Sequence, residues 1–319
     1  MPSEFDLIAR FFTRPAPNAV LGVGDDAALL AVAPDMELAV STDMLVSGQH
    51  FFPDVDPYLL GHKTLAVNLS DLAAMGATPR WATLSLALPA AEAGWLEVFS
   101  RGLFDMADRF EVSLVGGDTT RGPLNLCVTI LGEVPAGQAL RRSGARVGDD
   151  VWVSGDLGGA ALGLRYLLHE IDLADAAEIE ACLIRLHAPE PRVALGRALL
   201  GVAHVAIDVS DGLLADLGHI LECSEVGAQL DFARLPAHPA VAARLPHPLA
   251  QRCLLAGGDD YELCFTAAPA RAHVVLAAAA AAGVHVTRIG RITAESGLRV
   301  LAADGAAMNI EEVGFDHFK

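Results

Sequence analysis

The chain has 319 residues, of which 53% are hydrophobic and 19% are charged, and its formal net charge is -18. This composition predicts a folded protein with a substantial core, long enough for two domains, and excludes an intrinsically disordered chain. The acidic balance also argues against a nucleic-acid partner, because no basic stripe is available to neutralise phosphates.

No apolar run approaches the ~20 residues that a membrane-spanning helix needs. The first residues, "MPSEFDLIARFF", lack the basic-then-apolar layout of a signal peptide, so we expect a cytoplasmic protein with no membrane partner. The cysteines are odd in number, form no CxxC pair and lie mostly in apolar segments, which favours buried reduced thiols over a zinc site or disulfides. They are Cys127, Cys182, Cys223, Cys253 and Cys264.

The first half of the chain alternates predicted strands with predicted helices. Apolar and β-branched runs between turn signals predict strands at 37–42, 81–88, 112–116 and 124–134. Helical length and periodicity predict helices at 58–77 and 92–110. The polar segment "RRSGARVGDD" interrupts this pattern, and we expect a domain boundary there, with domains at 1–142 and 143–319.

The second half restarts with the strand "DVWVSG" and continues as an α/β domain. Further strands are expected at 203–209, 228–232, 260–266 and 284–292, and further helices near 175–187, 190–201, 212–224 and 269–282. The glycine-rich turn "SGDLGGAALG" is compatible with a dinucleotide site. Its spacing is not GxGxxG, however, and no regular βαβ unit follows it, so the pattern favours another use.

Aspartates recur beside glycine or serine in five apolar segments: "LGVGDDA", "ELAVSTDML", "SLVGGDTT", "VAIDVSDG" and "LLAGGDDYE". Any one of these acids has a simpler explanation as a helix cap or a turn residue. Their repetition in one position favours a shared role. Together with an aspartate inside an apolar helix, the set comprises Asp25, Asp26, Asp43, Asp71, Asp118, Asp208, Asp211, Asp259 and Asp260.

Asp71 lies in the predicted helix 58–77, three residues after Asn68 and therefore on the same face. A carboxylate on a largely buried helix needs a partner, either an arginine or a divalent cation shared with other carboxylates. Aspartates with serine and threonine hydroxyls form an all-oxygen ligand set, which selects Mg²⁺, Mn²⁺ or Ca²⁺ over zinc. The adjacent glycines allow backbone N–H groups to approach phosphate oxygens.

The usual lysine-based phosphate sites are absent from this sequence. The chain has only two lysines, Lys63 and Lys319, and neither follows a glycine as a P-loop requires. The motifs of protein kinases are missing too. Any nucleotide is therefore expected to be held by metals, backbone groups and arginines, with Arg142 as a candidate.

Eight ordered motifs resemble those of the thiamine-monophosphate kinase family, from about residue 4 to residue 318. They are "VGDDAALL", "STDMLVSGQHF", "AVNLSDLAAMGATP", "GGDTTRGP", "LRRSGARVGD", "AIDVSDGLLADLGHI", "GGDDYELCF" and "GFDHF". The resemblance implies an α/β (α+β) fold of the aminoimidazole ribonucleotide synthetase superfamily. Its N-terminal mixed sheet would form a barrel across a homodimer, its C-terminal domain would be α/β, and the active site would lie in the cleft between the two domains. The implied reaction converts ATP and thiamine monophosphate into ADP and thiamine diphosphate, the last step in making that cofactor.

The resemblance also implies residue roles. Positions that match magnesium ligands are Asp26, Ser41, Thr42, Asp43, Asp71, Asp118, Asp208 and Asp211, which would hold several Mg²⁺ ions. Positions that match ATP contacts are Gly117, Asp118, Arg142 and Ser210, and positions that match thiamine contacts are His50, Asp259 and Phe315. The family usually has Glu where this chain has Asp259, one methylene shorter. Taken alone, His50 after its Gly-Gln turn is as compatible with a satisfied polar residue as with a functional one, and Phe315 would be a core residue that anchors the tail.

The acceptor in such a reaction is a phosphate monoester, mostly dianionic at neutral pH because its second pKa is ~6. It therefore needs no general base, and we expect direct in-line transfer in which Mg²⁺ offsets the repulsion between two anions. Two alternatives remain open. One is a sister member of the superfamily that activates another acceptor, and the other is a cation- or nucleotide-binding regulator without turnover.

Overall fold

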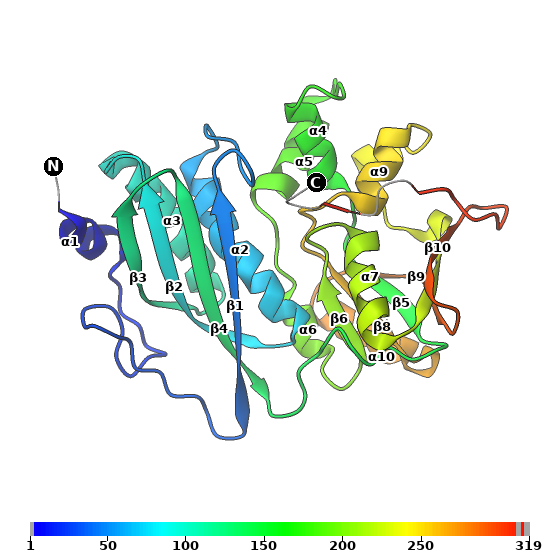
Figure 1. The fold of residues 1–319 in the computed structure, drawn as a ribbon, viewed down its shortest axis with the longest axis horizontal. Coiled ribbons are helices and arrows are strands. Elements are labelled where there is room, and N and C mark those ends of the chain that lie inside the picture. The colour runs from blue at the N-terminus through cyan, green and yellow to red at the C-terminus, as the bar shows by residue number, and fades with distance from the viewer. Residues whose placement is uncertain (1–2, 311–313, 316–319) are drawn as a thin grey trace. The chain divides into compact units, whose positions relative to one another are not determined.

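We describe a computed structural model of the chain, which covers residues 3–310 and 314–315. The chain forms two compact units (Figure 1). Unit 1 contains the chain up to Leu72 together with Ala77–Gly137, and unit 2 contains Ala73–Gly76 and the chain from Gln138 onward. Among the described residues, no helix is both long enough and apolar enough to cross a bilayer.

Unit 1 is built on a four-stranded mixed sheet in the order β1-β4-β2-β3. Strand β2 runs parallel to β3 and antiparallel to β4, which in turn runs antiparallel to β1. The predicted mixed sheet is thereby confirmed. Its strands are β1 (Met36–Val46), β2 (Thr78–Leu88), β3 (Ser113–Arg121) and β4 (Asn125–Pro135).

Helices α2 (Pro57–Ala74) and α3 (Ala93–Arg109) cover one face of this sheet (Figure 1). Strand β4 directs Leu126, Val128 and Ile130 to the covered face, where all three are buried, and the alternate residues to the open face. A short helix α1 (Glu4–Leu7) and a π-helical segment η1 (Ile8–Phe12) precede these elements.

Unit 2 contains a six-stranded sheet in the order β10-β7-β9-β5-β8-β6. All neighbours in it are antiparallel except β10 and β7. The strands are β5 (Asp150–Ser154), β6 (Val205–Asp208), β7 (Gly227–Asp231), β8 (Leu263–Ala267), β9 (Val286–Thr293) and β10 (Gly297–Leu301).

The helices of unit 2 pack around this sheet. They are α4 (Gly159–Leu167), α5 (Ala176–His187), α6 (Val193–Ala198), α7 (Leu213–Ser224), α8 (Pro239–Ala242), α9 (Pro248–Ala256) and α10 (Ala272–Ala281), with 3₁₀ turns η2 (Phe232–Arg234) and η3 (Pro269–Arg271). The core is one apolar cluster in which strand residues such as Val151, Val153 and Ile207 meet helix residues such as Leu217 and Leu254.

Three elements of unit 2 were not expected from the sequence. Helix α9 begins after His247, an unusual capping residue whose ring nitrogen accepts from the N–H of Leu249. Helix α8 begins in the same way after His238. Strand β10 depends on parallel pairing with β7, more than 60 positions away, which no local pattern reveals.

The cysteines largely follow the expectation. All five are free thiols, and Cys182, Cys253 and Cys264 are buried. Cys127 is half-buried, and Cys223 is exposed near the end of α7, contrary to the expectation of burial for the whole set.

Candidate functional site

In unit 1, strand β1 and helix α2 bring four polar side chains together on the covered face of the sheet. The Ser41 hydroxyl donates to Oδ2 of Asp71 at 2.5 Å. The backbone N–H of Asp43 donates to Oδ1 of Asn68 at 3.1 Å, and Asn68 is itself held by donation to the carbonyl of Thr64. The prediction that Asp71 and Asn68 share a face of a buried helix agrees with these contacts.

Thr42 and Asp118 project from the opposite face of the same sheet. Thr42 alternates with Ser41 and Asp43, and its hydroxyl lies 2.5 Å from that of Thr129 on β4. Asp118 is level with Ser85 of β2, which is level with Cys127 on the open face of β4. Two of the matched positions are therefore separated by the sheet from the Ser41–Asp71 pair.

The sequence predicted that the aspartates lie at the ends of strands. This is correct for Asp208, the last residue of β6, but not for all of the aspartates. Asp43 and Asp118 lie inside β1 and β3, because ladder pairing with β4 and β2 continues beyond them. Asp26 lies in an exposed loop, where its N–H donates to Oδ1 of Asp25. Asp259 follows the helix α9 and precedes β8.

Three further matched positions also lie outside regular elements. His50 closes a turn after β1, accepting at Nδ1 from the N–H of Val46 at 3.0 Å while its own N–H donates back to the Val46 carbonyl. Arg142 is exposed, in the polar segment that the sequence marked. Phe315 is 54% exposed, and the last three residues of the "GFDHF" motif lie outside the described residues.

In unit 2, the turn after β6 carries Ser210 and Asp211 and is held by a carboxylate that the sequence analysis did not assign. Oδ2 of Asp216, in the first turn of α7, accepts from the backbone N–H groups of Ser210, Asp211 and Gly212 at 3.0, 3.1 and 3.1 Å. Burial raises the pKa of Asp216 to about 7, the charge of Asp211 adds to the increase, and the three N–H groups oppose it. Asp216 could have been identified from the sequence as an aspartate inside an otherwise apolar helix, the same signal that identified Asp71.

The segment from Gly257 to Glu262 lies against the same turn. The N–H of Asp259 donates to the Ser210 carbonyl at 2.9 Å, and the N–H of Tyr261 donates to the Val209 carbonyl at 2.8 Å. Asp259 and Tyr261 both have positive φ, 67° and 49°, a conformation that non-glycine residues adopt only where surrounding contacts enforce it.

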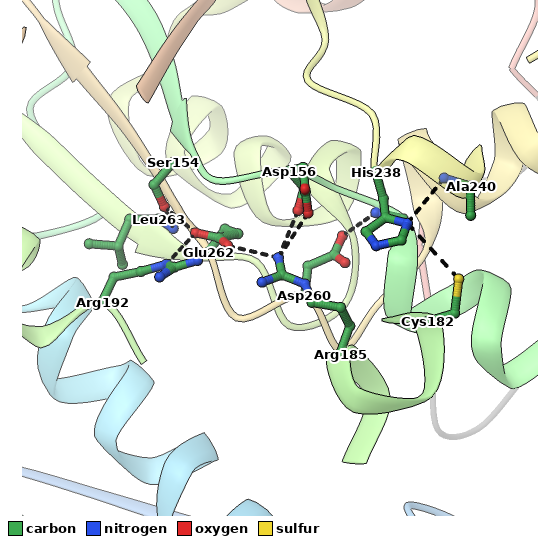
Figure 2. Close-up of polar contacts among 11 residues, drawn as sticks. Ser154, Asp156, Cys182, Arg185, Arg192, His238, Ala240, Asp260, Glu262 and Leu263 are labelled. Carbon is green, nitrogen blue, oxygen red and sulfur yellow. Dashed lines mark hydrogen bonds and ion pairs between the residues drawn. The ribbon is translucent and has the colours of Figure 1, made fainter. Parts of the chain in front are cut away.

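Glu262, the last residue of this segment, is held by a buried ion network with Arg185 and Arg192 (Figure 2). Its carboxylate accepts from the Ser154 hydroxyl at 2.6 Å, from Nη2 of Arg185 at 2.8 Å, and from Nε and Nη2 of Arg192. Burial alone would raise the pKa of Glu262, but the hydrogen bonds and charges of the two arginines outweigh it and lower the pKa below its ordinary value. No local pattern predicts this network, because its members are up to 108 positions apart.

Asp260, also in Figure 2, is fully buried beside this network. The N–H of Gly158 donates to its Oδ2 at 2.8 Å, so the glycine-rich turn "SGDLGG" binds a carboxylate of the chain itself. Burial raises the pKa of Asp260 well above its ordinary value. Asp260, counted with the candidate ligands, therefore belongs to the anchoring of the 257–262 segment.

The oxygen-rich donor set suits a hard cation. Serine and threonine hydroxyls and carboxylates, with no cysteine or histidine among the matched ligand positions, are the ligands Mg²⁺ accepts. Within either unit, taken over the described residues, no three His, Cys, Asp or Glu side chains are gathered tightly enough to form a metal site alone. Of the matched ligand positions in unit 1, Ser41, Asp43 and Asp71 lie on the covered face of the sheet, Thr42 and Asp118 lie on the opposite face, and Asp26 lies in a loop. The matched positions in unit 2 are Asp208 and Asp211.

Two family descriptions match the chain. "AIR synthase related protein, N-terminal domain" matches residues 24–134, and "AIR synthase related protein, C-terminal domain" matches residues 146–302. Thiamine-monophosphate kinase of Escherichia coli strain K12 is 46% identical over 318 residues, covering 99% of this chain and 98% of that protein.

Solved structures give the same result. Thiamine-monophosphate kinase from Stenotrophomonas maltophilia K279a is 49% identical, with a TM-score of 0.85 and 95% of each chain covered. AaThiL complexed with AMPPCP and TMP is 31% identical, with a TM-score of 0.79, covering 93% of this chain and 92% of that one.

Proposed function

Because this chain belongs to the thiamine-monophosphate kinase family, we propose that it transfers a phosphoryl group from ATP to thiamine monophosphate, giving thiamine diphosphate and ADP. The observation that carries the proposal is 46% identity to a kinase of that name along 99% of the chain. The complex of a relative with AMPPCP and TMP supports the pair of substrates. We assign the reaction to the cytoplasm, where ATP is available.

Several Mg²⁺ ions would be held by oxygen ligands, some of which belong to unit 1 and others to unit 2. The proposed ligands are Asp26, Ser41, Thr42, Asp43, Asp71, Asp118, Asp208 and Asp211. When bound, such ions neutralise the phosphates of donor and acceptor and align them for transfer. The 2.5 Å contact between Ser41 and Asp71 supports this assignment in unit 1, because it places two oxygen donors side by side.

The remaining matched positions would bind the two substrates. We assign Gly117, Asp118, Arg142 and Ser210 to ATP, and His50, Asp259 and Phe315 to thiamine monophosphate. At Gly117 an added Cβ would lie 1.9 Å from the Leu84 carbonyl oxygen, so only glycine brings the backbone into this position. The backbone N–H of Asp259 donates to the Ser210 carbonyl, and we assign its carboxylate, one methylene shorter than the usual Glu, to the acceptor.

Transfer would proceed in line and directly, without a phosphoenzyme. The acceptor phosphate is already an anion at neutral pH, so no side chain has to remove a proton from it. The protein's own residues would contribute orientation and charge stabilisation. Trapping of a phosphorylated aspartate during turnover would contradict this mechanism.

The proposed assembly is a homodimer formed through the open face of the unit 1 sheet. On the edge strand β1, Leu38, Val40 and Met44 alternate on that face and are 43%, 57% and 52% exposed. Of the four side chains that β1 presents on this face from Leu38 to Met44, three are apolar and exposed and the fourth is Thr42, a composition that favours burial against a second copy.

The first experiment is product analysis with ATP, Mg²⁺ and thiamine monophosphate, comparing wild type with Asp71→Asn. We expect equal amounts of thiamine diphosphate and ADP from wild type and a loss of about 100-fold in the variant, because a shared cation ligand is removed. Asp108→Asn is the control, since that carboxylate is 71% exposed and pairs with Arg14 at the surface.

The other outcomes identify the alternatives. ADP without thiamine diphosphate would indicate a different acceptor. Nucleotide binding without any product would indicate a regulator that has lost turnover, and Asp259→Glu would then be the variant to assay.

A further inference from the structure

The turn formed by Ser210, Asp211 and Gly212 in unit 2 is bound on both sides of its backbone. Its three N–H groups donate to the single oxygen Oδ2 of Asp216. The carbonyl of Ser210 accepts from the N–H of Asp259 at 2.9 Å. The carbonyl of Asp211 accepts from the N–H of Phe315 at 3.0 Å.

These contacts join residues with different proposed roles. Ser210 and Asp211 are assigned to ATP and Mg²⁺, whereas Asp259 and Phe315 are assigned to the acceptor. Each of the two peptide units in the turn therefore links Asp216 on one side to an acceptor contact on the other. A displacement of the turn would move both sets of residues together.

Burial and hydrogen bonds hold Asp216 in this position. Its residue is 3% exposed, and three consecutive N–H groups converge on its carboxylate as they do in backbone anion sites. The convergence requires Gly212 at φ 116°, where an added Cβ would lie 2.7 Å from the Ala256 carbonyl carbon. A buried carboxylate is costly without such donors, so the turn and the acid stabilise each other.

A simpler role for Asp216 would be stabilisation of helix α7, because an acid in the first turn interacts favourably with the helix dipole. The N–H groups that donate to Asp216 indicate a role beyond stabilisation of the helix. All three N–H groups belong to residues that precede the helix, and two of these residues, Ser210 and Asp211, are assigned to ATP and Mg²⁺.

We propose that Asp216 is a positioning residue that holds the Ser210–Gly212 turn and thereby sets the ATP side and the acceptor side of the site at once. The inference rests on the proposed function for the roles of Ser210, Asp211, Asp259 and Phe315. It goes beyond that function by making one buried side chain the common support of both substrates.

The test compares wild type with Asp216→Asn, using Glu222→Gln as a control on the exposed face of the same helix. We expect the KM for ATP, the KM for thiamine monophosphate and the half-saturating Mg²⁺ concentration to rise together by about 10- to 100-fold in Asp216→Asn. The melting temperature should change much less than these constants, and Glu222→Gln should match wild type throughout. A variant that melts early but whose folded fraction keeps wild-type constants would show a merely structural role and overturn the proposal.

Amide hydrogen exchange separates this proposal from the proposed function, because it needs no turnover. In wild type, the amides of 210–212 should exchange as slowly as those of β6, and in Asp216→Asn the amides of 210–212, 259 and 315 should all exchange faster. Fast exchange of 210–212 in wild type would overturn the proposal even if the variant does not fold. A wild type without thiamine diphosphate production, but with this exchange pattern, would overturn the proposed function and leave the support by Asp216 intact.

Discussion

At the scale of single residues, buried ion pairs hold Glu262 in place. Its carboxylate is fully buried and receives both Arg185 and Arg192, together with the Ser154 hydroxyl. This contact set fixes the start of β8 and, through it, the positive-φ backbone of Asp259 and Tyr261. The backbone that carries Asp259, the proposed acceptor contact, thus depends on the charges around Glu262.

Replacing Glu262 by Gln should destabilise the protein strongly. The substitution removes the buried carboxylate that Arg185 and Arg192 share and leaves Arg185 with the Asp156 carboxylate at 3.3 Å, at a cost of about 3 to 5 kcal/mol. Thermal or denaturant unfolding measures this loss. Glu178→Gln is the matched control, because the Glu178–Arg244 pair is partly exposed and should contribute about 1 kcal/mol or less.

The same residue predicts a pH dependence. The folded-state pKa of Glu262 lies below the ordinary value of 4.5, so its ionised form stabilises the protein above pH 4.5. That contribution is lost as pH falls through the lower folded-state pKa. The difference in unfolding free energy between wild type and Glu262→Gln should therefore shrink on acidification below pH 4.5, and a constant difference would contradict this explanation.

At the scale of elements, the close packing of α2 on α3 in unit 1 holds Asn68 and Asp71 against the sheet. Two glycines permit it. An added Cβ at Gly61 would lie 2.1 Å from the Phe99 carbonyl oxygen, and one at Gly102 would lie 2.0 Å from the Tyr58 carbonyl oxygen. These backbones cannot yield as a flexible side chain could, so the helix pair depends on both glycines.

Gly102→Ala should therefore destabilise the protein by about 1 to 3 kcal/mol and loosen α2. Gly94→Ala on the same helix is the control, because nothing lies within 4 Å of its added Cβ. That substitution should leave stability unchanged or raise it by up to about 1 kcal/mol, since alanine favours the helix. Melting temperatures of the two variants measure the difference, and equal destabilisation by both would mean that helix propensity, not packing, is responsible.

At the scale of the whole molecule, the open face of the unit 1 sheet is the feature that single-chain packing does not explain. Its edge strand β1 exposes Val40 to 57% between Leu38 and Met44. An edge strand with an exposed apolar row invites association unless a partner covers it.

Val40→Asp should convert the proposed homodimer into a monomer, because it inserts a charge into the middle of the apolar row. Light scattering coupled to size-exclusion chromatography measures the mass directly. Val20→Asp is the control, since Val20 is 70% exposed in a loop of the same unit outside β1. A wild type that is monomeric at micromolar concentration would contradict the proposed assembly.

The sequence by itself determined the class of fold and most of the elements. Alternating apolar patterns located β1, β2 and β4, and helical periodicity located α2, α3 and α7, because these signals are local. Ordered motifs indicated the family. The placement of Asp71 and Asn68 on one face of a helix followed from their spacing alone.

The tertiary structure alone decided which face of a sheet each side chain occupies and which distant residues meet. It separated Thr42 from Ser41 and Asp43, and it joined Glu262 to Arg185 and Arg192. It also showed that Asp216 accepts hydrogen bonds from the Ser210–Gly212 turn, and that α8, α9 and β10 are present. For the Glu262 network and for β10 the physical reason is the same: strand pairing and buried charge pairing are made by contacts between segments far apart in the chain, and local sequence carries no record of which segments will meet.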